Sequence, residues 1–97
     1  ANLNAVLKLP FQCIKMDRSM LNGIRQHKVA GEFYRNIVTI LRQQGYAIVA
    51  EGVEEQEEVE LLEAWGVDMI QGYYFSRPLP VEEFLIRRVL EQVSGHG

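Results

Sequence analysis

The sequence has little cysteine, little proline and no long apolar run, and each scarcity removes a class of protein. A single cysteine, Cys13, excludes a disulfide framework and a cysteine-based metal site. It lies in an apolar stretch, where we expect a small buried side chain and not a nucleophile. Three prolines and 47% hydrophobic residues among 97 indicate an ordinary globular chain and not a disordered one.

Membrane and nucleic-acid classes are also disfavoured. No apolar run approaches the roughly 18 residues that a membrane-spanning helix needs, and the N-terminus lacks the basic-then-apolar pattern of a signal peptide. We therefore expect a cytoplasmic protein. Ten basic and thirteen acidic side chains give a net charge of -3, which argues against broad binding of a nucleic-acid polymer.

The hydrophobic periodicity alternates between short continuous runs and helix-spaced positions, which predicts three strand–helix units. The expected elements are a short helix before Pro10, a strand at 11–17, a helix at 29–44, a strand at 46–50, a helix at 55–65, a strand at 69–75 and a last helix opened by Pro80. Gly45 and Gly66 are expected to end the two middle helices.

Each helix is expected to bury one apolar side. The expected buried positions are Val29, Phe33, Ile37 and Leu41 in the first long helix, Val59, Leu62 and Trp65 in the second, and Phe84, Leu85, Val89 and Val93 in the last. The glutamates of 55–65 would then form a solvated face.

Strands separated by helices of this length form parallel units, because a parallel neighbour requires a crossover of a dozen or more residues. Three such strands cannot close a barrel, yet their apolar character demands cover on both faces and both edges. The sequence therefore predicts an α/β chain that lacks an N-terminal portion, or that has a partner chain in its place.

Polar residues interrupt or follow all three expected strands. They are Lys15 with Asp17, Glu51 with Glu54, and Gln71. An unpaired charge inside a buried strand costs several kcal/mol, on the order of a lost ion pair. Ligands of parallel α/β folds bind at the C-terminal ends of strands, so these residues predict a site at that edge.

Three motifs lie at these positions, in the order CIKMDRS at 13–19, VAEGVE at 49–54 and QGYYFSRP at 71–78. With these motifs the sequence closely resembles the EAL-domain family of cyclic-di-GMP phosphodiesterases. The resemblance covers nearly the whole chain. It implies that residues 1–97 are the C-terminal fragment of one EAL domain, strands six to eight of a TIM-like (β/α)8 barrel, with 93–97 as a frayed tail.

The resemblance also implies a function, a cofactor and roles for individual residues. The expected reaction is hydrolysis of cyclic-di-GMP, a bacterial second messenger, to linear pGpG by metal-activated water, with Mg²⁺ or Mn²⁺. Lys15 would contact that water and the scissile phosphate, and Glu51 would act as general base or orient the water. Glu54 and Gln71 would support catalysis, and Gln71 would also contact the ligand.

Further expectations concern secondary candidate residues, the metal ligands, the partners and the location of the protein. Asp17 and Arg77 are secondary candidates for ligand contacts. The family's main metal ligands would lie upstream of Ala1, so no metal ligand is expected here and the isolated chain should be inactive. The expected partners are cyclic-di-GMP, the rest of the barrel or a second chain, and a further copy in a homo-oligomer. The parent is expected to be cytoplasmic, or the cytoplasmic part of a larger signalling protein.

The residues leave alternatives open. Lys15 fits a structural ion pair with Asp17 or Glu51, and a lysine at such a strand end also suits a Schiff-base lyase. Glu51 could cap the following helix, and Glu54 fits that role better. Gln71 could simply hydrogen-bond backbone. At the level of the protein, the alternative is an inactive EAL domain that acts as a cyclic-di-GMP receptor or an interaction module.

Overall fold

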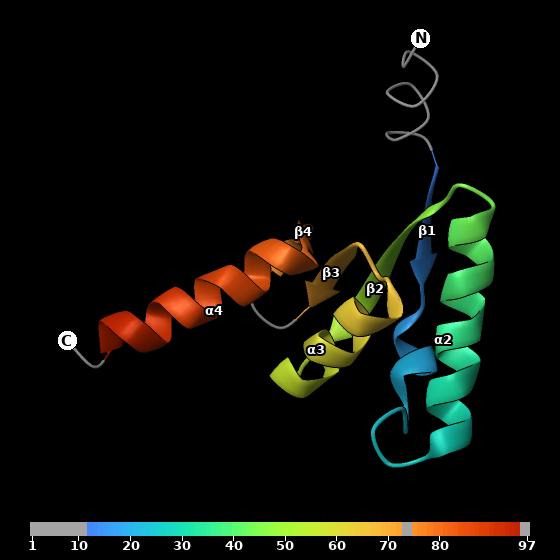
Figure 1. Cartoon of the computed structure of the whole chain (residues 1–97), viewed down its shortest axis with the longest axis horizontal. Helices are drawn as coiled ribbons and strands as arrows, with labels where there is room; N and C mark the ends of the chain where they lie inside the picture. The colour runs from blue at the N-terminus through green and yellow to red at the C-terminus, as the bar shows by residue number, and fades with distance from the viewer. Residues whose placement is uncertain (1–11, 73–74, 96–97) are drawn as a thin grey trace, which may run out of the picture.

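The computed structural model describes residues 12–72 and 75–95 (Figure 1). Its elements are β1 (Cys13–Met16), the 3-10 helix η1 (Arg18–Leu21), α2 (Lys28–Gln43), β2 (Ala47–Val53), α3 (Gln56–Trp65), β3 (Met69–Gly72), β4 (Phe75–Pro80) and α4 (Val81–Gly95). The helix expected before Pro10 lies outside the described residues. No described helix has the length and apolar character needed to cross a membrane.

The strands form one open sheet in the order β1-β2-β3-β4. β1, β2 and β3 are parallel, as predicted, and they are joined by α2 and α3. The prediction of a single strand at 69–75 is wrong, because β3 ends at Gly72 and β4 pairs with it antiparallel. β4 thereby satisfies backbone groups that the edge of β3 would otherwise leave open, and its prolines are tolerated because β4 is itself an edge strand.

The two middle helices begin and end close to the predicted residues. α2 is followed by Gly45 and α3 by Gly66, and both glycines have the left-handed backbone that ends a helix, with φ of 94° and 99°. The strand predicted at 46–50 continues to Val53. α4 begins one residue after Pro80 and runs to Gly95, into the expected tail.

The core lies between the sheet and the helices α2 and α3. Its buried side chains include Met16, Ile48, Ala50 and Ile70 from the strands, and Tyr34, Val38, Val59 and Leu62 from the helices. The rings of Tyr34 and Trp65 pack with their centroids 6.0 Å apart, which joins α2 to α3. Glu57, Glu60 and Glu63 of α3 are exposed, as expected, whereas Glu58 is half-buried.

Two expectations about burial are wrong. α2 buries Tyr34 and Val38 on the side that meets the sheet, while Val29 and Phe33 are exposed. The same holds for α4, where Phe84 is buried but Val89 and Val93 are exposed. Both helices carry apolar residues on two sides, and periodicity alone does not tell which side the sheet covers.

Cys13 is exposed, contrary to the expectation of a buried thiol. It belongs to β1, the first strand of the sheet, whose residues alternate between the two faces. The side chain of Cys13 falls on the face that α2 and α3 do not cover.

Candidate functional site

The strand register brings three candidate residues of the sequence onto neighbouring strands. Lys15 of β1 lies opposite Val49 of β2, and Glu51 of β2 lies opposite Gln71 of β3. Val49 and Glu51 are two residues apart and so point to the same side of β2. Lys15, Glu51 and Gln71 therefore lie on one face of the three parallel strands, with Lys15 two residues nearer the start of the strands than the Glu51–Gln71 pair, and we call these three residues the row.

The alternation of side chains decides which face of the sheet carries this row. The residues between them, Met16, Ala50 and Ile70, point into the core beneath α2 and α3. Side chains of successive strand residues point to opposite faces, so Lys15 and Glu51 point away from those helices, and Gln71 starts from the same side but, at the end of β3, also borders the cavity beside α3 and α4 described below. We call this side of the sheet the open face. Lys15 is exposed there, and Glu51 and Gln71 are half-buried.

A bulge in β2 follows Glu51 directly. Gly52 has a φ of 73°, and the register with β3 shifts between Glu51 and Val53. A Cβ atom at Gly52 would lie only 2.3 Å from Cγ of Arg18, so the side chain of Arg18 lies flat across this glycine. The bulge thus lets η1 approach the C-terminal end of β2. One sequence signal pointed to the contact between Arg18 and Gly52, namely the glycine that follows Glu51. That signal did not identify Arg18 as the partner.

Asp17, a secondary candidate, has a local structural role. Its carboxylate accepts hydrogen bonds from the Ser19 hydroxyl at 2.6 Å and from the Ser19 amide at 2.9 Å, which caps η1. Both hydrogen bonds lower the pKa of Asp17, and the one from the Ser19 hydroxyl has the larger effect. Arg77, the other secondary candidate, is exposed on β4, the strand beyond the row.

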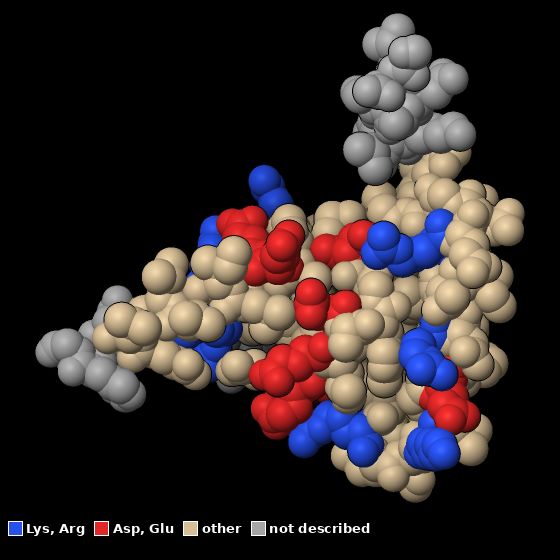
Figure 2. All heavy atoms as spheres, in the orientation of Figure 1, with Lys and Arg blue, Asp and Glu red and all other residues tan. Residues whose placement is uncertain are grey.

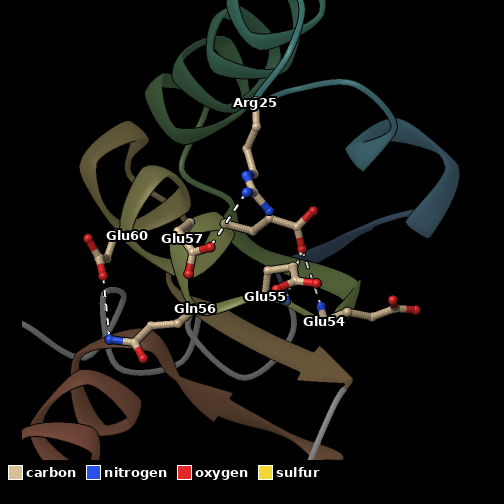
Figure 3. A network of polar contacts seen from close by, with 7 residues as sticks. Arg25, Glu54, Glu55, Gln56, Glu57 and Glu60 are labelled. Carbon is tan, nitrogen blue, oxygen red and sulfur yellow. Dashed lines mark hydrogen bonds and ion pairs between the residues drawn. The ribbon is translucent and has the colours of Figure 1, made fainter.

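The carboxylate that caps α3 is neither Glu51 nor Glu54. Glu58 accepts hydrogen bonds at 3.3 Å from the backbone amides of Glu54 and Glu55. The side chain of Glu54 is exposed and extends away from the network of Figure 3, where Arg25 contacts Glu57 at 3.5 Å. The capping role considered for Glu54 is therefore wrong, and its carboxylate stays available at the C-terminal end of β2.

Gln71 and Glu54 also border a cavity of about 240 Å³ between α3, β3 and α4. The cavity is lined further by Phe84 and by Arg88, which donates a hydrogen bond to Gln56 at 3.3 Å. The outer surface next to it is strongly acidic. Figure 2 shows carboxylates gathered over α3 and the start of α4, with blue cationic groups over α2. An anionic ligand is therefore better accommodated near Lys15 than on the outside of α3.

The described residues offer no set of metal ligands. They contain no group of three or more His, Cys, Asp or Glu side chains that could hold a metal ion. Glu51 supplies one carboxylate to the open face, and Mg²⁺ is usually held by one or two carboxylates together with waters and substrate phosphates.

Comparison with known proteins gives consistent matches. The family model described as "EAL domain" matches residues 1–78. Cyclic di-GMP phosphodiesterase PdeL of Escherichia coli is 38% identical over 82 residues, 84% of this chain and 23% of that protein. A crystal structure of an EAL domain protein from Listeria monocytogenes is 37% identical with a TM-score of 0.63, covering 93% of this chain and 36% of that one.

A structure of the PaMucR phosphodiesterase in complex with c-di-GMP is also similar. It is 33% identical with a TM-score of 0.61, and the match covers 82% of this chain and 33% of that chain. The chain thus spans about a quarter to a third of the relatives it matches here. Because the family model covers most of the chain and the solved EAL structures share its fold, the chain belongs to the EAL domain family and is related to cyclic-di-GMP phosphodiesterases.

Proposed function

We propose that this chain is the C-terminal part of an EAL domain that hydrolyses cyclic-di-GMP to linear pGpG. The observation that carries the proposal is the row of Lys15, Glu51 and Gln71 on the open face, where Glu51 stands opposite Gln71 on adjacent strands. Two relatives, PdeL and PaMucR, are named as phosphodiesterases. In this proposal strands β1 to β3 are strands six to eight of the barrel.

The residues of the row suit phosphodiester hydrolysis. The ammonium of Lys15 is a compact cation that stabilises negative charge on phosphoryl oxygens. The carboxylate of Glu51 accepts the proton of the attacking water, and the amide of Gln71 orients the ligand beside it. Glu54 supplies a second carboxylate at the C-terminal end of β2. The Mg²⁺ or Mn²⁺ of such a domain would be held by other residues, so the 97-residue chain alone is inactive.

The test uses the complete domain that contains this chain, assayed with Mg²⁺ by chromatography of the nucleotide products. Glu51→Gln keeps the size of the side chain but removes the base, and hydrolysis should fall by about 10²–10⁴-fold. Glu60→Gln is the matched control, because Glu60 is exposed on α3 and its carboxylate accepts a hydrogen bond from the side chain of Gln56 on the same helix. The control should hydrolyse at nearly the wild-type rate.

Binding of cyclic-di-GMP is measured separately by calorimetry. Glu51→Gln should bind the nucleotide within a few-fold of wild type, because the substitution removes the proton acceptor and keeps the size of the side chain. Unchanged turnover in Glu51→Gln would contradict its role. Wild-type protein that binds the nucleotide without hydrolysing it would instead support the receptor alternative.

A further inference from the structure

The two facing candidates of the row are each followed by a glycine, and these glycines bring β2 and β3 into close contact. Glu51 lies opposite Gln71, and Gly52 and Gly72 come next. A Cβ atom at Gly72 would lie 2.6 Å from the amide nitrogen of Val53 and 3.0 Å from the carbonyl carbon of Gly52. The backbone of β3 therefore packs directly against the bulge that follows Glu51.

The hydrocarbon stem of Arg18 packs against the same bulge from η1. A Cβ atom at Gly52 would lie 2.6 Å from Cβ of Arg18 and closer still to its Cγ and Cδ, so the stem fills the space that a side chain at Gly52 would occupy. The root of the stem is held in place, because Arg18 is the first residue of η1 and the Asp17 carboxylate caps this turn through Ser19. Gly52 is thus in contact with η1 as well as with β3.

The part of Arg18 that touches the bulge is apolar. The three atoms nearest to a Cβ atom at Gly52 are all carbons of its stem. Among the described residues, the guanidinium of Arg18 forms no ion pair or hydrogen bond, unlike that of Arg25, which lies 3.5 Å from the Glu57 carboxylate. Arg18 instead borders an open cavity of about 350 Å³. The contact with Gly52 therefore depends on the length and shape of the Arg18 side chain and not on its charge.

Gly52 permits the bulge but does not hold it by itself. Its φ of 73° is available to glycine at little cost, and so are negative values of φ. The conformation at Gly52 is then decided by the groups packed around it, which here are the stem of Arg18 and the backbone of β3. Because one peptide bond joins Glu51 to Gly52, a change of conformation at this glycine turns Glu51 relative to Gln71.

We propose that Arg18 is a positioning residue of the phosphodiesterase site. Its stem holds Gly52 in the bulge and thereby keeps the Glu51 carboxylate beside Gln71 on the open face, and its charge is not required. The proposal rests on the proposed function in taking Glu51 as the acceptor of the water's proton. Because a misplacement of about 1 Å can lower a rate by about 10²-fold, loss of the stem should lower kcat and leave KM largely unchanged.

The test measures kcat and KM for cyclic-di-GMP with the complete domain that contains this chain, in the presence of Mg²⁺. Arg18→Ala removes the stem beyond Cβ, and kcat should fall by about 10-fold or more while KM stays within about twofold of wild type. Arg18→Met keeps an unbranched stem without the charge and should restore kcat to within about twofold of wild type.

The matched control is Arg25→Ala, which removes an arginine from the segment between η1 and α2 and breaks its contact with Glu57 on α3. It should leave kcat close to the wild-type value. An equal fall of kcat in Arg25→Ala would show that general loosening of this segment is responsible, and it would overturn the proposal. So would an unchanged kcat in Arg18→Ala. Equal losses in Arg18→Ala and Arg18→Met, or a raised KM in Arg18→Met, would assign the role to the guanidinium and would also overturn it.

Backbone NMR signals supply a readout that does not depend on activity. The amide signals of residues 51–53 should move in Arg18→Ala and should return close to their wild-type positions in Arg18→Met, whereas Arg25→Ala should leave them in place. Unmoved signals in Arg18→Ala would overturn the inference. A wild-type domain that hydrolyses nothing would contradict the proposed function, and the NMR comparison would then decide by itself whether Arg18 holds the bulge.

Discussion

Arg42 and Asp68 form an ion pair with 3.1 Å between the guanidinium Nη1 and the carboxylate Oδ1, at the end of the sheet opposite the candidate site. The other carboxylate oxygen of Asp68 accepts a hydrogen bond from the backbone amide of Ile48 at 2.8 Å. Arg42 also donates to the carbonyl of Gly66. One carboxylate thus joins the end of α2, the start of β2 and the start of β3.

Replacing Asp68 should destabilise the chain more than replacing Arg42. Asp68→Ala leaves the amide of Ile48 without its acceptor, which we expect to cost about 1–3 kcal/mol. Arg42→Ala removes a partly exposed ion pair and should cost about 1 kcal/mol or less. Urea denaturation monitored by circular dichroism measures both. Asp68→Asn retains an acceptor for Ile48 and should lose less than Asp68→Ala; an equal loss in these two variants would contradict the role of that hydrogen bond.

Gly72 should not tolerate a side chain. Its φ is 148°, and an added Cβ would lie 2.5 Å from the carbonyl oxygen and 2.6 Å from the amide nitrogen of Val53. We expect Gly72→Ala to cost about 3 kcal/mol or more, because dihedral strain and a backbone clash combine. Gly45→Ala is the control: it also has a positive φ, but its nearest atom would be 3.6 Å away. Its cost should stay at roughly 1 kcal/mol, from the dihedral alone. Similar thermal midpoints for the two variants would show that the contact with β2 is not close.

Removing the hydroxyl of Tyr34 should leave stability unchanged or raise it. The ring is fully buried, and its hydroxyl has no hydrogen-bond partner among the described residues. Because an unsatisfied buried hydroxyl is unfavourable, Tyr34→Phe should be neutral or stabilise by up to about 1 kcal/mol. Tyr34→Ala loses the packing with Trp65 and should cost about 3–5 kcal/mol. A large loss in Tyr34→Phe, measured in urea, would reveal a hydrogen bond at this hydroxyl.

The same residue predicts a dependence on alkaline pH. Burial, followed by the charge of Glu58, raises the pKa of Tyr34 in the folded chain. As the pH rises, the Tyr34 hydroxyl therefore loses its proton in the unfolded chain before it does so in the folded chain. The stability of the folded chain is thus unaffected by this group below about pH 10 and falls at higher pH. Tyr34→Phe should reduce the fall by at most about 1.4 kcal/mol per pH unit. Urea midpoints from pH 8 to 11 check this, and identical slopes in both proteins would contradict it.

Asp17 predicts an effect at acidic pH. Because Ser19 lowers the pKa of this carboxyl, Ser19→Ala should raise it toward its ordinary value. The lowered pKa stabilises η1 above the ordinary pKa of an aspartate, and this contribution is lost as the pH falls through the lower folded value. Carboxyl chemical shifts measured by NMR across pH 2 to 6 report the change. An unaltered titration of Asp17 in Ser19→Ala would show that another group holds its carboxylate.

The elements and the row of candidate residues followed from the order of amino acids. The apolar runs and the helix periods located β1, β2, α2 and α3, with both glycine ends. Polar residues that interrupt or end the apolar strand runs indicated Lys15, Glu51 and Gln71, and the parallel register places them on one face. These features depend on spacing within the chain, which is why local patterns predicted them.

Tertiary contacts decided the remainder. β4 forms because the edge of β3 is open, and Val29 and Phe33 are exposed because α3 and the sheet cover the other sides of α2. Glu58 instead of Glu54 caps α3, and Arg18 crosses Gly52 at the bulge. Each of these outcomes depends on which groups approach from distant parts of the sequence. A period of 3.6 or 2 residues states which side chains share a face, but only the packed neighbours determine which face is covered.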